Sequence, residues 1–117
     1  MGKSILKDKS YVFAIRIVKL SQFLQTEKKE YLLSKQILRS GTSIGALIRE
    51  AEFGQSKPDF IHKMSIALKE ANETEYWLCI LIDTGYIELN LFESIQNDVK
   101  ELIAMLVSTV KTTKQAK

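Results

Sequence analysis

Apolar side chains recur every three or four residues along most of the chain, which is the spacing of one face of an α-helix. In the first segment this stripe contains Phe13, Ile17, Leu20 and Leu24. Similar stripes follow in three later segments, the last containing Ile95, Val99, Leu102 and Leu106. The pattern predicts helices over residues 8–25, 31–53, 57–84 and 89–112.

The breaks between these segments carry turn and capping residues. Gly54 suits the left-handed position that ends many helices, and Ser56, Pro58 and Asp59 after it are typical of a helix start. Gly85 ends the third segment. Gly41 and Gly45 lie inside the second segment, but the apolar stripe keeps its phase across them. We therefore predict one continuous helix there, with a close approach of another helix at the glycines.

Length and composition fit a single domain of 117 residues in which helices dominate. The chain has one proline and five glycines, and 45% of its residues are hydrophobic. Four helices with short connections pack as antiparallel neighbours, so we expect an all-α, up-and-down four-helix bundle. Residues 1–7 and 113–117 are expected to fray. The sequence shows neither a signal peptide nor an apolar run long enough to span a membrane, so we expect a cytoplasmic protein without membrane contact.

Charge is distributed unevenly, although the net charge is only +3. Residues 1–57 contain eleven Lys and Arg against five Asp and Glu, a balance of +6, and residues 58–117 contain six against nine, a balance of −3. Lys35, Arg39 and Arg49 fall on one side of the second helix and are candidate nucleic-acid contacts, together with Arg16 and Lys19 of the first helix. The alternative is that the basic half pairs with the acidic half inside the molecule.

Several apolar residues point away from the predicted core. On the third helix Ile66, Trp77 and Ile80 share a side with Glu70 and Glu73, and these five residues are the candidate subunit interface. The first helix adds Tyr11, Val12, Ile15 and Phe23 around its circumference. Large apolar side chains off the core face favour contact with another chain, so we expect a homo-oligomer. Glu70 and Glu73 are also expected to pair with Arg39, Arg49 or Lys63.

No catalytic or metal-binding constellation is found in the sequence. The single cysteine, Cys79, and the single histidine, His62, lie 17 positions apart on one predicted helix, too far for a thiol–imidazole pair. One histidine also falls short of the ligand set of a di-iron bundle. We expect a protein without enzymatic activity, cofactor or metal.

Two segments resemble a bacterial four-helix-bundle family that is linked to ribosomal-RNA intervening sequences. The resemblance rests on Leu38-Arg39-Ser40-Gly41-Thr42-Ser43-Ile44-Gly45 with Arg49-Glu50-Ala51, on Asp59-Phe60, and on Lys63 to Leu78 with its Glu73-Thr74-Glu75-Tyr76-Trp77 core. It implies a ring of bundles, typically a homopentamer, and a link to ribosomal RNA. A similar bundle accompanies the reverse transcriptase of diversity-generating retroelements. Gly45-Ala46-Leu47 departs from the Ala-Asn often found in the family.

These observations lead to two hypotheses of function. The first is a homo-oligomeric helical module that binds structured RNA or other nucleic acid through a basic surface. The second is a scaffold that holds a protein partner in grooves of the oligomer. Both assign the function to an assembly rather than to a pocket within one chain.

Overall fold

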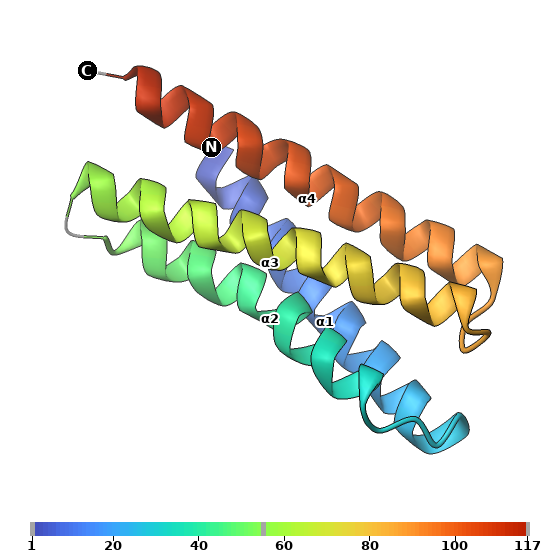
Figure 1. The fold of residues 1–117 in the computed structure, drawn as a ribbon. Coiled ribbons are helices and arrows are strands. Elements are labelled where there is room, and N and C mark those ends of the chain that lie inside the picture. Colours follow the sequence, from blue (N-terminus) through green and yellow to red (C-terminus); the bar gives the residue numbers. More distant parts are fainter. Residues whose placement is uncertain (1, 55, 117) are drawn as a thin grey trace.

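The computed structural model describes residues 2–54 and 56–116, and it confirms the four-helix bundle (Figure 1). The helices are α1 (Gly2–Glu27), α2 (Leu33–Glu52), α3 (Lys57–Asp83) and α4 (Leu89–Gln115). Each runs antiparallel to the next, and the molecule is a rod of about 50 × 21 × 20 Å. The α1–α2 and α3–α4 turns lie at one end of the rod, and the α2–α3 turn lies at the other.

The helix boundaries agree with the predicted ones to within three residues except at the start of α1. That helix begins at Gly2, six residues before the predicted position. Leu6 is only 2% exposed and lies seven residues before Phe13, so the buried stripe continues two turns further than the sequence pattern indicated. At the other terminus α4 continues to Gln115, where we had expected fraying, and Val110 still packs against the core.

The core is formed by the predicted stripes, with small shifts in phase. On α2 the apolar core residues are Ile37, Ile44, Ile48 and Ala51, and on α4 they are Ile95, Val99, Leu102 and Leu106. On α3 the buried set includes Leu78 and Leu81, whereas the neighbouring Ile82 is half-buried. Burying each large aliphatic side chain contributes about 1.5–3 kcal/mol, so these stripes are the main source of stability.

The two glycines of α2 allow α1 to approach closely, as predicted. A Cβ atom at Gly41 would lie 2.8 Å from two carbons of Ile17, and one at Gly45 would lie 3.2 Å from Ser10 Oγ. Helix α2 is continuous through both positions. The cost of two glycines inside a helix is therefore offset by tight packing of α1 on α2.

Two of the predicted turn features differ in their outcome. Ser56 does cap α3, because its side chain accepts a hydrogen bond from the Asp59 N–H at 3.2 Å. The left-handed conformation predicted for Gly54 is wrong: among the described glycines only Gly85 has a positive φ, at 82°. Gly54 is required for space instead, since a Cβ there would lie 2.9 Å from Asp59 Oδ2 and 3.0 Å from the Ala51 carbonyl oxygen.

The α1–α2 turn is organised by a buried carboxylate. Glu30 is 8% exposed, and its side chain accepts hydrogen bonds from the N–H groups of Leu32, Leu33 and Ser34 at 3.2, 3.0 and 2.7 Å. The Ser34 hydroxyl donates back to the Glu30 carbonyl oxygen at 2.9 Å. This arrangement satisfies the free N–H groups at the start of α2. Lys29, just before it, has φ of 54°.

None of the helices in the described part of the chain combines the length and the apolar character needed to cross a lipid bilayer.

Candidate nucleic-acid interface and assembly surface

The five candidate cations do not form one continuous surface. Arg16 and Lys19 line a groove between α1 and α4 of about 270 Å³, with Leu20, Phe23, Leu91 and Ile95. Arg39 faces α3, whereas Arg49 lies over the Tyr11 ring of α1, with its guanidinium carbon 5.9 Å from the ring centroid. Lys35 is exposed on the first turn of α2. Sequence spacing gives the direction of each side chain around its own helix axis. It does not tell which other helix lies in that direction.

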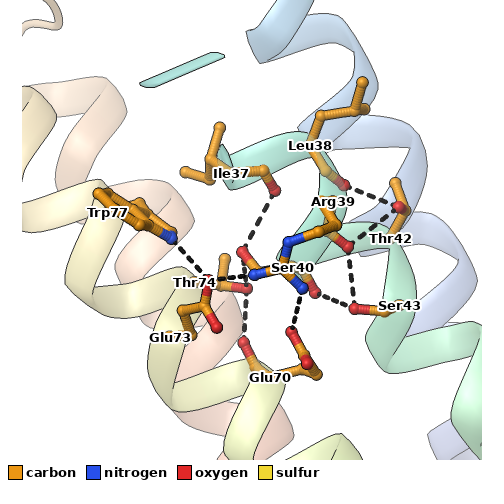
Figure 2. A network of polar contacts seen from close by, with 10 residues as sticks. All are labelled: Ile37, Leu38, Arg39, Ser40, Thr42, Ser43, Glu70, Glu73, Thr74 and Trp77. Carbon is orange, nitrogen blue, oxygen red and sulfur yellow. Dashed lines mark hydrogen bonds and ion pairs between the residues drawn. The ribbon is translucent and has the colours of Figure 1, made fainter. Parts of the chain in front are cut away.

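Arg39 is engaged by two carboxylates of α3, as Figure 2 shows. Its Nη1 donates to Glu70 Oε1 at 3.1 Å and its Nη2 donates to Glu73 Oε2. The hydrogen bond with Glu73, assisted by the bond and charge of Glu70, raises the pKa of the guanidinium group. With two negative charges beside it, Arg39 carries no surplus positive charge for a phosphate.

Glu73 is held by a second donor on its own helix. The indole Nε1 of Trp77 donates to Glu73 Oε2 at 2.9 Å, one turn along α3 (Figure 2). This hydrogen bond, followed by the hydrogen bond and the positive charge of Arg39, lowers the pKa of the Glu73 carboxyl group. Glu73 therefore accepts hydrogen bonds from both Arg39 and Trp77, and both of its partners belong to the same subunit.

A hydroxyl pair joins α2 and α3 beneath this ion pair. Ser40 and Thr74 are both fully buried, and their oxygens are 3.0 Å apart. Thr74 Oγ1 also lies 2.8 Å from the Glu70 carbonyl oxygen. Sequence reasoning missed this pair, although Ser40 falls in phase with Ile37 and Ile44 on the buried stripe, which was the available signal.

Part of the charge asymmetry is balanced by ion pairs inside the molecule. Three cations of the basic half pair with carboxylates of the acidic half: Lys9 with Glu101 at 3.2 Å, Arg16 with Asp98 at 2.8 Å, and Arg39 with its two glutamates. Lys63 pairs with Glu50 at 2.9 Å, and this hydrogen bond raises the lysine pKa. Among the five candidates, Lys19, Lys35 and Arg49 have no carboxylate within ion-pair distance in the described part of the chain.

The five candidate interface residues of α3 are all half-buried rather than exposed. Trp77 packs against the core and meets Tyr76 edge-to-face, with ring centroids 5.1 Å apart. Ile66, Glu70, Glu73 and Ile80 have similar intermediate exposure. Six of the twelve exposed large apolar side chains in the described structure lie on α1, where Tyr11 is 56% and Val12 64% exposed, and Tyr76 of α3 is 59% exposed.

Among residues 2–54 and 56–116, no group of three or more His, Cys, Asp or Glu side chains is arranged to hold a metal ion. Cys79 is half-buried, and burial raises the pKa of its thiol. His62 is exposed on α3. A groove of about 640 Å³ lies beside the α2–α3 turn and is lined by acidic and basic side chains together with the exposed Phe53.

Comparison with known proteins places this chain in a family. The family model described as "23S rRNA-intervening sequence protein" matches residues 3–108. A crystal structure at 1.70 Å of a protein of unknown function from the S23 ribosomal protein family of Bacteroides thetaiotaomicron is 60% identical. The alignment covers 95% of this chain and 99% of that one, with a TM-score of 0.94. Comparison with curated proteins gives no match. The chain belongs to the 23S rRNA-intervening sequence protein family.

Proposed function

We propose that this protein is a non-enzymatic, homo-oligomeric helical module of the bacterial cytoplasm that binds structured RNA through cations repeated around the assembly. The observation that carries the proposal is the state of Lys19, Lys35 and Arg49. They stay exposed and without a carboxylate partner in the described structure, whereas Arg16 and Arg39 are neutralised. The name of the family, which refers to intervening sequences of 23S rRNA, supports RNA as the ligand.

Three dispersed cations give weak binding on one subunit. Repeating them in an oligomer raises the effective concentration of the second and later contacts, so a weak surface becomes useful by avidity. A homopentamer is the assembly that we favour. The exposed side chains of Tyr11, Val12 and Ile15 on α1 support assembly, because apolar area of this kind is often covered by another subunit.

Binding of a labelled ribosomal-RNA hairpin, measured by fluorescence anisotropy over a range of salt concentrations, tests the RNA part. The triple variant Lys19→Gln, Lys35→Gln and Arg49→Gln should weaken binding and reduce the slope of log affinity against log salt by about 2–3. A matched variant that replaces Lys69, Lys111 and Lys114 with Gln removes the same charge elsewhere. Absence of binding by the native protein at low salt would overturn the proposal.

Light scattering tests the assembly. One chain has a mass of 13.4 kDa, so a pentamer gives about 67 kDa, which is five times that value. Val12→Glu places a charge at a position that is 64% exposed on α1 and should lower the observed mass. Val107→Glu, at a 47% exposed position of α4, is the matched control. A mass of 13.4 kDa for the native protein at micromolar concentration would rule out an oligomer.

A second candidate function is a scaffold for a protein partner. Two grooves run between α1 and α4, of about 280 and 270 Å³, and their floors include Phe13, Leu102, Leu20 and Ile95. Helices α1 and α4 also pack against each other less closely than the other neighbouring pairs do. If the assembled protein, purified from its host and treated with nuclease, retains no protein partner in stoichiometric amount, the scaffold role is wrong.

A further inference from the structure

We propose that the α1–α2 turn is the surface that holds an unpaired segment of RNA, with a base stacked on Tyr31 and phosphates on Lys29 and Lys35. This inference rests on the RNA-binding function proposed above and names the contact that it would use. The turn lies at one end of the rod, beyond the last turn of α1 (Figure 1).

The turn presents apolar side chains to solvent from a fixed backbone. Tyr31 is 51% and Leu32 78% exposed. The backbone beneath them is held by Glu30, whose buried carboxylate accepts hydrogen bonds from three backbone N–H groups. It is also held by Ser21, whose hydroxyl donates to the Ser34 carbonyl oxygen at 3.1 Å. A pre-organised surface that displays a ring loses little freedom on binding, which favours recognition.

The cations of the turn are available. Lys29 and Lys35 are exposed, and no ion pair involves either of them in the described structure. The two acidic residues of the turn are Glu27, which is exposed, and Glu30, whose buried carboxylate accepts hydrogen bonds from backbone N–H groups. Lys28 is not part of the proposed contact, because its ammonium lies over the Phe23 ring and it lines a groove together with Glu88.

Lys29 occupies a backbone conformation that rarely suits lysine. Its φ of 54° is in the left-handed region, where glycine or asparagine fits with less strain. This conformation turns the chain out of the end of α1, where the Glu30 N–H donates to the Leu24 carbonyl oxygen at 3.0 Å. The turn leaves the Lys29 side chain exposed to solvent. That side chain is a cation two residues before the exposed Tyr31 in the sequence.

An exposed ring in a turn that also carries two exposed lysines without ion-pair partners fits single-stranded nucleic acid better than other polyanions. Any base can stack on a tyrosine, but only when the base is free of a duplex. Binding to an anionic membrane scales with the apolar area that enters the interface, and two side chains supply little of it. The turn therefore selects an unpaired strand over a duplex or a lipid surface.

The test compares a labelled single-stranded RNA of about 16 nucleotides with the same strand in a duplex, by anisotropy at low salt. Tyr31→Leu keeps an apolar side chain but removes the ring, so the single-strand Kd should rise about tenfold and the duplex Kd should stay constant. Tyr31→Phe keeps the ring and should bind as the native protein does. Phe53→Leu removes a ring that is 83% exposed at the opposite end and serves as the control.

Lys29→Asn separates the task of the side chain from its strain. It should reduce the salt slope for single-stranded RNA by about 0.7, the value of one phosphate contact, without lowering the melting temperature. Lys69→Gln, which removes an exposed charge from the middle of α3, is the control.

The outcomes distinguish the two proposals. If the native protein binds neither RNA form, the proposed function fails and this inference fails with it. If it binds RNA but Tyr31→Leu and Lys29→Asn bind equally well, the inference alone is wrong. Equal losses for single strand and duplex would refute stacking. Binding to vesicles of anionic phospholipid that depends on Tyr31, with RNA binding unchanged, would assign the turn to a membrane instead.

Discussion

At the scale of single residues, the bundle depends on a few side chains whose roles are invisible in a hydrophobic pattern. Glu30 is a charged residue in a polar stretch, and the sequence suggested only a turn there. In the structure it is buried and closes the start of α2. Carboxylate hydrogen bonds to backbone N–H groups at a helix start are favourable because they satisfy free donors and oppose the helix dipole.

Replacing Glu30 with Ala should therefore lower the free energy of unfolding by about 1–2 kcal/mol, since three N–H groups lose their acceptor. Thermal and urea denaturation measure this change. Glu27→Ala, at an exposed position three residues earlier, is the control and should stay within about 0.5 kcal/mol of the native protein. Equal stability of the two variants would show that water replaces the carboxylate without cost.

Gly41 gives a second prediction at this scale. Alanine has the higher helix propensity by about 1 kcal/mol, but its Cβ would lie 2.8 Å from Ile17. We expect Gly41→Ala to destabilise the bundle by about 1–3 kcal/mol. The cost should shrink when Ile17 is also replaced by Ala, because the clash is removed. An increase in stability for Gly41→Ala alone would contradict the close approach of α1.

At the scale of helices, the seam between α2 and α3 combines a buried hydroxyl pair with the Arg39, Glu70, Glu73 and Trp77 cluster. The sequence predicted that Glu70 and Glu73 pair with Arg39, Arg49 or Lys63, and in the structure their partner is Arg39. The sequence also placed Trp77 on a side of α3 that points away from the core residues of that helix. This describes the direction of Trp77 around the α3 axis but not what surrounds it. Helix α2 lies beside that position, and the position of a neighbouring helix cannot be read from one helix's periodicity.

The seam has a predictable dependence on pH. The pKa of Glu73 is lowered in the folded state, first by the Trp77 N–H and then by Arg39, so its contribution to stability is present above the ordinary value of 4.5. That contribution is lost as the pH falls through the lowered pKa. Glu73→Gln should lower the melting temperature at pH 7 and show a smaller further loss at pH 3 than the native protein.

Glu101→Gln is the matched control for this experiment, because it removes one carboxylate from the exposed ion pair with Lys9. Screening by solvent keeps the Glu73 effect small, since the side chain is 35% exposed. An acid-induced loss of the same size in Glu73→Gln and in the native protein would mean that the Trp77 and Arg39 contacts do not act on Glu73 in solution.

At the scale of the molecule, the fold was predictable because each helix has an apolar stripe at helical spacing, and because Ser56 and Gly85 mark breaks between helices. The candidate site was less predictable. Lys35, Arg39 and Arg49 share a side of α2 by sequence spacing, yet one is paired across to α3 and another leans over Tyr11 of α1. Which charges remain free is decided by contacts between helices, and these depend on distances that a single sequence does not contain.

Trp77→Ala and Val12→Glu should separate stability from assembly. Trp77 packs against the core of its own subunit and holds Glu73, so its loss should lower the free energy of unfolding by about 2–3 kcal/mol and leave the oligomer mass unchanged. Val12→Glu should lower the oligomer mass and leave the free energy of unfolding nearly unchanged. Thermal denaturation and light scattering on both variants measure the two effects. A fall in mass for Trp77→Ala would return the subunit interface to α3.

The antiparallel course of the four helices gives the rod a polarity. The start of α1, the end of α4 and the α2–α3 turn lie at one end, and the α1–α2 and α3–α4 turns lie at the other (Figure 1). Subunits related by a cyclic axis that runs along the rods all point the same way, so such a ring has two unlike rims. One rim would gather the start of α1, the end of α4 and the α2–α3 turn of every copy. The opposite rim would carry Tyr31 and Lys29 from each copy, so that a ring of identical sites faces one direction.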